Sequence, residues 1–205
     1  MRTATSTPRP LMTRRVLPLL PALLLLAPGA ALAHPGHGEA VGFAHGFAHP
    51  VGGLDHVLAM VAVGLLAALR GGAARWGLPV AFMAMMAAGA GLGVFGIALP
   101  FAEAGIALSL VAFGLAIVFA GRLPLPALIG LVGVFAVFHG YAHGAEMPET
   151  ASGLAYGAGF LAATALLHAA GLGLGFLVSA ERRRAAPAMG AAVALSGLTL
   201  LVGAF

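Results

Sequence analysis

The chain contains no cysteine and no lysine, and each absence excludes a class of chemistry. Without cysteine it can form no disulfide, no thiolate metal site and no cysteine nucleophile. Without lysine it has neither a retinal Schiff base nor the lysine of a phosphate-binding P-loop. The sequence therefore excludes a rhodopsin and a chain that hydrolyses ATP by itself.

Charged residues are also scarce: they make up 8% of the 205 residues, whereas 61% are hydrophobic. The mean hydropathy of +1.05 is far above that of a soluble domain, and several apolar runs reach the length of about 20 residues that a bilayer span needs. Residues 34–205 contain as many arginines as acidic residues. We therefore expect a lipid bilayer and no nucleic acid among the partners.

The N-terminus predicts a secretory signal peptide over residues 1–33. Arg14 and Arg15 precede a short apolar run, which ends in an A-x-A cleavage site at 31–33. Two prolines within the run disfavour a spanning helix, so an uncleaved anchor is the weaker alternative. The adjacent arginines leave both Sec and Tat export open.

The rest of the chain predicts an all-α, polytopic membrane protein. A periplasmic histidine-rich segment (34–53) is followed by a bundle of six transmembrane helices (54–205). The six apolar segments lie at 54–69, 77–98, 103–120, 124–143, 153–179 and 187–205. Glycines spaced four residues apart, such as Gly89/Gly93 and Gly171/Gly175, suit close helix crossings, and a homo-oligomer could form through such faces.

The distribution of arginine predicts the orientation. Arginines follow the first, third and fifth segments, whereas the charged residues in the loops after the second and fourth segments are all acidic. Positively charged loops stay in the cytoplasm. We therefore expect a multi-pass protein of the bacterial inner membrane with a periplasmic mature N-terminus.

Two stretches nearly repeat each other, and both are built from histidine. Residues 45–49 and 139–143 share the pattern H-G-aromatic-A-H, and acidic residues follow each of them. Histidines four residues apart point from one face of a helix, and the predicted orientation puts both stretches near the periplasmic face. A divalent cation explains such a concentration of polar groups in an apolar chain, although histidines paired across helices are the structural alternative. The predicted metal ligands are His45, His49, Asp55, His56, His139, His143 and Glu146.

Between the first histidine stretch and the first span, Pro50, Gly52 and Gly53 interrupt the chain. We expect a short outer helix or re-entrant piece, a bend, and then the first span. Asp55 at the start of that span fits two compatible roles. It can favour the helix dipole as a cap, or orient a neighbouring histidine as a hydrogen-bond acceptor.

Three further histidines are candidates for a secondary metal or proton site: His34, His37 and His168. His34 would become the first residue after cleavage. We expect that it either captures the metal ion or belongs to a mobile polar tail. His168 lies inside the fifth span as a deeper metal stop, a proton acceptor or, slightly favoured, an interhelical hydrogen-bonding group.

Glu103 is predicted to cap a helix. We interpret Met83, Met85 and Met86 as packing residues.

Two composite motifs, H-P-x-G-G-x-D-H at 49–56 and F-H-G-x-A-H-G-x-E at 138–146, resemble those of the HupE/UreJ family. The resemblance covers nearly the whole mature chain. It implies a membrane protein of nickel-hydrogenase and urease systems, regarded as a permease for nickel and sometimes cobalt. By the resemblance, the family's functional positions are His49, Asp55, His56, His139, His143 and Glu146.

The expected function is import of Ni²⁺, or of Co²⁺, from periplasm to cytoplasm, without enzymatic activity and without a resident cofactor. Transport could be passive or coupled to protons. One alternative is an intramembrane zinc-dependent hydrolase, with Asp55 or Glu146 as general base and Ser152 as a helper. Another is a metal sensor or chaperone that binds the ion without moving it.

Overall fold

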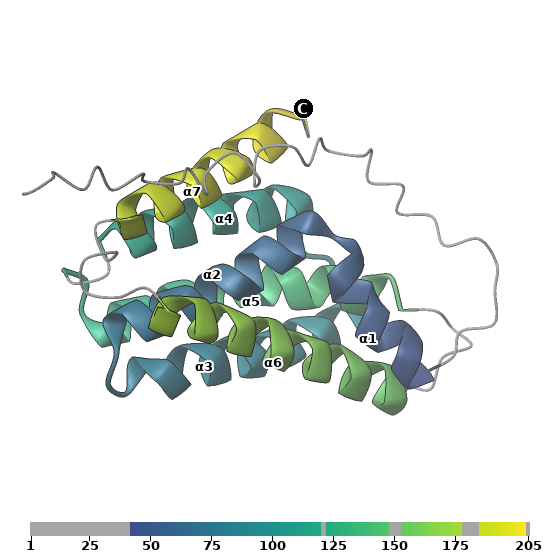
Figure 1. Cartoon of the computed structure of the whole chain (residues 1–205). Coiled ribbons are helices and arrows are strands. Elements are labelled where there is room, and N and C mark those ends of the chain that lie inside the picture. Colours follow the sequence, from purple (N-terminus) through teal and green to yellow (C-terminus); the bar gives the residue numbers. More distant parts are fainter. Residues whose placement is uncertain (1–41, 120–121, 148–152, 178–184, 204–205) are drawn as a thin grey trace, which may run out of the picture. The chain divides into compact units, whose positions relative to one another are not determined.

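The computed structural model describes residues 42–119, 122–147, 153–177 and 185–203. The predicted signal peptide, His34, His37 and Ser152 lie outside these residues. Where the chain is described it consists of helices and connecting turns, without a strand, which confirms the all-α class (Figure 1). The helices are α1 (Gly42–Gly52), α2 (Leu54–Arg70), α3 (Ala74–Val94), α4 (Ala102–Val118), α5 (Leu125–Ala145), α6 (Gly153–Leu177) and α7 (Ala186–Gly203).

Each of the six predicted apolar segments is one helix, and the first histidine stretch forms an additional helix, α1. Four helices, α3, α5, α6 and α7, are long and apolar enough to cross a membrane. α1 and α2 together make a fifth candidate, as a broken span or a re-entrant loop, while α4 has only 17 residues. The described helices thus supply four or five spans by length and composition, and the count of six remains a prediction.

The chain bends by 84° between α1 and α2. Pro50 lies within α1, and the break comes at Gly53, whose extended backbone (φ −103°, ψ 122°) separates the two helices. The bend that the sequence predicts is therefore present, and α1 packs against α6.

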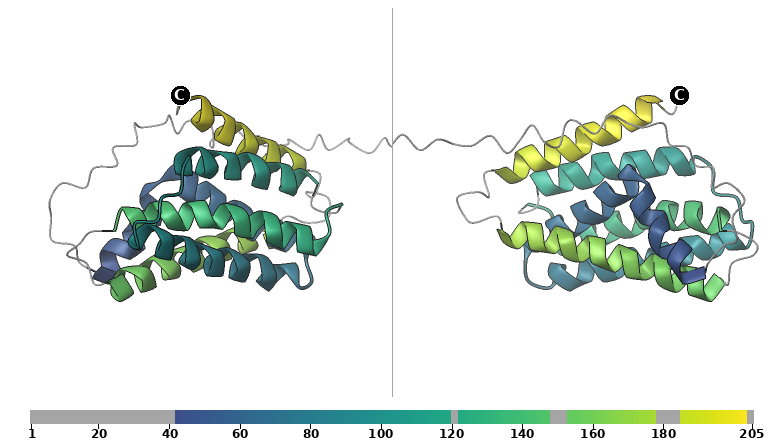
Figure 2. Two further views of the ribbon diagram at one scale, coloured as in Figure 1. Left: turned by 180° about the vertical axis from the view of Figure 1, so that it is seen from behind. Right: turned by 45° about the vertical axis from the view of Figure 1, so that its right-hand side comes forward.

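α2 is the central helix, and its apolar side chains form much of the core. It packs against α6 and also touches α3 and α4. Met60, Val63 and Leu66 of α2 are fully buried. α3 packs against α5, and α7 packs against α4 at the outside of the bundle, as the views of Figure 2 show.

The bundle has two chemically different ends. The arginine end carries Arg70, Arg75 and Arg122 at the end of α2, the start of α3 and the turn after α4. There the guanidinium of Arg75 lies 5.3 Å from the ring centre of Phe176 at the end of α6. The opposite end, which we call the histidine end, contains both histidine stretches. α2 connects the two ends over about 26 Å at 1.5 Å per residue.

Glycines let neighbouring helices approach until their backbones touch. A Cβ atom at Gly140 or Gly144 of α5 would collide with the backbone of Met86 or Ala90 in α3. The predicted pair Gly171/Gly175 similarly lies against α2, and Gly89/Gly93 lies against α5. These close crossings hold α3 against α5 and α2 against α6.

Candidate metal site

The structure brings histidines of α1, α2 and α5 into one group, which we call the histidine cluster: His49, His56, His139 and His143. The ring centre of His143 lies 4.7 Å from that of His49 and 4.4 Å from that of His56. His56 also contacts His139, at 4.9 Å between ring centres. Residues 83 or more positions apart in the sequence thus meet at the histidine end.

The elements that hold the cluster follow from local sequence. His139 and His143 lie one turn apart on the inward face of α5, and both are buried, at 0% and 3% exposure. His56 lies in the first turn of α2. Because the chain bends at Gly53, α1 folds back and places His49 against His143.

Two carboxylates hold imidazoles of the cluster. Asp55 Oδ1 lies 2.8 Å from His56 Nδ1 and also accepts the backbone N–H of His56 at 2.8 Å. Glu146 Oε2 lies 3.3 Å from His49 Nε2. This contact lowers the pKa of the Glu146 carboxyl below its ordinary value, so the side chain is ionised at neutral pH. The contact of Asp55 with His56 orients that histidine. The place of Asp55 in the first turn of α2 also suits the helix dipole.

Hydrogen-bond chemistry assigns the tautomer of three rings. A carboxylate can only accept, so His56 donates from Nδ1 to Asp55 and His49 donates from Nε2 to Glu146. The hydroxyl of Ser109 donates its one proton to the carbonyl of Ile106 at 2.6 Å. Ser109 must therefore accept from His139 Nε2, 2.9 Å away. In its neutral form, each of these rings keeps a lone pair on its other nitrogen.

Several of these nitrogens are buried without a hydrogen-bond partner among the described residues: His56 Nε2, His139 Nδ1, and both ring nitrogens of His143. An unsatisfied buried polar atom costs on the order of 1–3 kcal/mol. Imidazoles whose second nitrogen is held by an oxygen, leaving a free lone pair, are the usual arrangement of metal-binding histidines. The cluster can thus offer several neutral nitrogen donors to one cation.

The rings pack on one another rather than around a common point. Within the described ranges, no group of three or more histidine or acidic side chains is arranged to hold a metal ion as it stands. Binding an ion at the cluster would require the rings to rotate. His143 can rotate without breaking a hydrogen bond, because neither of its nitrogens makes one to a described residue.

The remaining predicted residues lie at or beyond the margin of the cluster. The ring of His45 is 6.4 Å from that of His49 and 6.1 Å from that of Tyr156, measured between centres. His168 is in a separate place, against Phe82. Glu103 lies in the first turn of α4, as predicted, but no side chain makes a capping hydrogen bond at the start of that helix.

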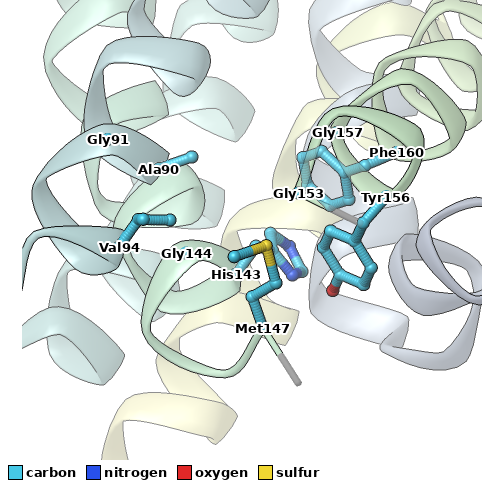
Figure 3. Close-up of a pocket in the computed structure, with 10 residues that line it drawn as sticks. All are labelled: Ala90, Gly91, Val94, His143, Gly144, Met147, Gly153, Tyr156, Gly157 and Phe160. Carbon is cyan, nitrogen blue, oxygen red and sulfur yellow. The ribbon is translucent and has the colours of Figure 1, made fainter. Parts of the chain in front are cut away.

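A small pocket leads to His143 from between α3, α5 and α6 (Figure 3). Its volume is about 110 Å³, and Met147, Tyr156 and Phe160 lie around it. Phe160 also packs on His143, with 4.1 Å between ring centres. The pocket therefore offers an approach to the one ring in the cluster that makes no hydrogen bond to a described residue.

Sequence reasoning missed several residues of the site: Ser109, Tyr156, Phe160 and Phe82. Ser109 carried a weak signal as an isolated hydroxyl in an otherwise apolar span, because buried polar groups need partners. Aromatic residues are common in membrane helices, so nothing distinguishes these from packing residues before the fold is known.

Comparisons with known proteins agree with the motifs. A family model described as HupE / UreJ protein matches residues 22–200. The curated "Protein HupE" of Rhizobium leguminosarum bv. viciae is 47% identical over 180 residues, which cover 87% of this chain and 94% of that protein. No solved structure matches the chain. With a family model over most of its length and a relative this similar, the chain belongs to the HupE/UreJ family.

Proposed function

We propose that the chain is a permease that carries Ni²⁺, or Co²⁺, across the bacterial inner membrane and supplies nickel enzymes such as hydrogenase or urease. The observation that carries this proposal is the histidine cluster: four imidazoles meet at one end of an apolar helical bundle, and three of them have a buried ring nitrogen without a hydrogen-bond partner among the described residues. Intramembrane polar groups of this kind mark ion pathways by default. Membership of a family of hydrogenase and urease accessory proteins supports the same function.

The chemistry of the cluster suits the proposed substrate. Imidazole nitrogen and carboxylate oxygen are ligands that Ni²⁺ and Co²⁺ accept readily, whereas Mg²⁺ and Ca²⁺ prefer oxygen alone. A hydrated ion reaching His143 through the pocket would exchange water for imidazoles as the rings rotate. Such a set would also bind Cu²⁺ tightly, so the choice of metal rests on geometry or supply.

The expected direction of transport follows from the two ends of the bundle. The arginine end suits the cytoplasm by the positive-inside rule, which leaves the histidine end at the periplasm. A doubly charged ion that crosses the full potential gains ~4.6 kcal/mol per 100 mV. Import down this gradient requires no ATP hydrolysis, in keeping with a chain that lacks a P-loop lysine.

The hydrolase alternative has less support from the geometry. A zinc hydrolase needs a carboxylate free to act on the metal-bound water. Asp55 is engaged by His56 and Glu146 by His49. A sensor or chaperone would show the same cluster, and only a transport measurement separates it from a permease.

The test is uptake of radioactive nickel into proteoliposomes that contain the wild-type protein or His143→Ala. We expect uptake by the wild type and at least a tenfold loss in the variant. Leu154→Ala is the matched control, because Leu154 is 90% exposed in the first turn of α6, at the same end of the bundle. Nickel binding without uptake by the wild type would instead identify a sensor or chaperone.

A further inference from the structure

His168 is a buried histidine that the histidine cluster does not use. It lies in the middle of α6 with 2% exposure, and neither ring nitrogen has a hydrogen-bond partner among the described residues. The ring of Phe82 stands edge-on to it, with 5.0 Å between centres. A neutral imidazole in either tautomer keeps one nitrogen lone pair. His168 therefore has a nitrogen inside the bundle that could bind a metal ion.

One face of α6 connects this position to the histidine cluster. Tyr156, Phe160, Thr164 and His168 follow one another at intervals of four residues, so they lie along one side of the helix. Tyr156 contacts the ring of His49, and Phe160 contacts the ring of His143. His168 lies two turns beyond Phe160, about 12 Å further toward the arginine end.

The facing side of α3 adds a second potential metal ligand, Met86, and an aromatic ring, Phe82. Met86 Sδ accepts the hydroxyl of Thr164 at 3.9 Å, and both side chains are fully buried. Phe82, one turn earlier on α3, contacts His168 and also His139, at 5.7 Å between ring centres. Its ring thus touches both the histidine cluster and His168.

We propose that His168, Thr164 and Met86 form an inner binding site for the transported Ni²⁺ or Co²⁺. This inference rests on the proposed function. The site would be a second position at which the ion binds along the same path. An imidazole nitrogen, a hydroxyl oxygen and a thioether sulfur are donors that a borderline cation of this class accepts, while hard cations avoid the sulfur. With a single strong ligand the site binds weakly, as release toward the arginine end requires.

Two other roles for His168 fit the contacts less well. The interhelical hydrogen bond slightly favoured from the sequence is not formed with any described residue. A proton relay needs a second titratable group in hydrogen-bond contact, and His168 makes no such contact within the described ranges. Met86, interpreted from the sequence as a packing residue, is buried against a hydroxyl rather than against hydrocarbon alone.

The test combines equilibrium nickel binding with nickel uptake in proteoliposomes for the full chain. His168→Gln removes the imidazole but keeps a polar side chain. Met86→Leu removes only the sulfur at similar volume, with Met85→Leu as its matched control, because Met85 is the adjacent residue of α3 and is 41% exposed. Thermal unfolding of each variant shows whether the bundle is intact.

We expect the wild type to bind two nickel ions and His168→Gln to bind one, with unchanged affinity for the remaining ion. The maximal uptake rate should fall at least tenfold in His168→Gln and about threefold in Met86→Leu, with unchanged half-saturating nickel concentration. Unchanged stoichiometry and uptake in both variants would overturn the inner site while leaving the proposed permease intact. A wild type that neither binds nor carries nickel would instead overturn both.

Discussion

At the scale of single residues, side-chain oxygen atoms orient three imidazoles of the histidine cluster. Asp55, Ser109 and Glu146 each hold one ring nitrogen and so determine which nitrogen remains free. His143 is the exception, with no partner among the described residues. Under the proposed function, three rings would be oriented before an ion arrives, and the fourth would be free to rotate. Such oxygen partners matter to metal affinity nearly as much as the ligands themselves.

Ser109→Ala tests this orientation with a change of one atom. It removes the acceptor for His139 Nε2, so the ring loses its fixed tautomer inside a fully buried environment. Nickel affinity should fall roughly 10–100-fold, as measured by equilibrium binding. The ¹⁵N shifts of labelled His139 should change from one tautomer to a mixture.

Ser196→Ala is the control for Ser109→Ala, because Ser196 is an exposed serine of α7 whose hydroxyl also bonds to its own helix. It should leave both nickel affinity and the ¹⁵N shifts unchanged. If Ser109→Ala behaved in the same way as this control, Ser109 would have no positioning role.

The two carboxylates predict a ranked pair of effects. Asp55 is closer to its histidine than Glu146 is, at 2.8 Å against 3.3 Å, and it is less exposed, at 27% against 47%. Exposed ion pairs contribute little because water screens them. Asp55→Asn should therefore raise the half-saturating nickel concentration for uptake more than Glu146→Gln does. The opposite order would assign the main role to the His49–Glu146 pair.

At the scale of helices, much of the fold could be predicted from the sequence. The six apolar segments are helices whose ends fall within a few residues of the predicted bounds, because arginines, prolines and glycines separate the runs. The bend at Gly53 was predicted from the same signals. The sequence did not predict that α1 packs on α6 or that α7 packs on α4. Which helices pack together depends on side-chain shape across the bundle.

Gly140→Ala tests the close approach of α5 to α3. A methyl group at Gly140 would collide with the backbone of Met86, whereas one at Gly130 of the same helix meets nothing within 4 Å. Overpacking of this kind costs about 1–3 kcal/mol. We expect a lower thermal unfolding temperature and weaker nickel uptake for Gly140→Ala, and wild-type behaviour for Gly130→Ala. Equal unfolding temperatures would contradict the observed crossing.

At the scale of the whole molecule, the meeting of the two histidine stretches could be anticipated from the alternation of arginine between loops, which places both stretches at one end of the bundle. Six of the seven predicted ligands do come together there, and His45 stays at the margin. The contacts that Ser109 and Phe82 make with His139 could not be anticipated, because only the folded bundle brings α3 and α4 against His139.

The absence of cysteine makes the orientation testable with single introduced thiols. Ala73 at the arginine end and Ala98 at the histidine end are both exposed. In intact spheroplasts, a membrane-impermeant maleimide should label Ala98→Cys at once and Ala73→Cys only after permeabilisation. The reverse pattern would place the histidine end in the cytoplasm and argue for export.

The central claim is that imidazoles from different helices, His56 of α2 and His143 of α5 among them, bind one and the same ion. Nickel K-edge X-ray absorption of the purified, nickel-loaded protein counts those imidazoles directly. We predict at least two imidazoles in the nickel shell of the wild type and fewer in both His143→Ala and His56→Ala. A shell of oxygen alone, or one that neither substitution changes, would contradict the claim.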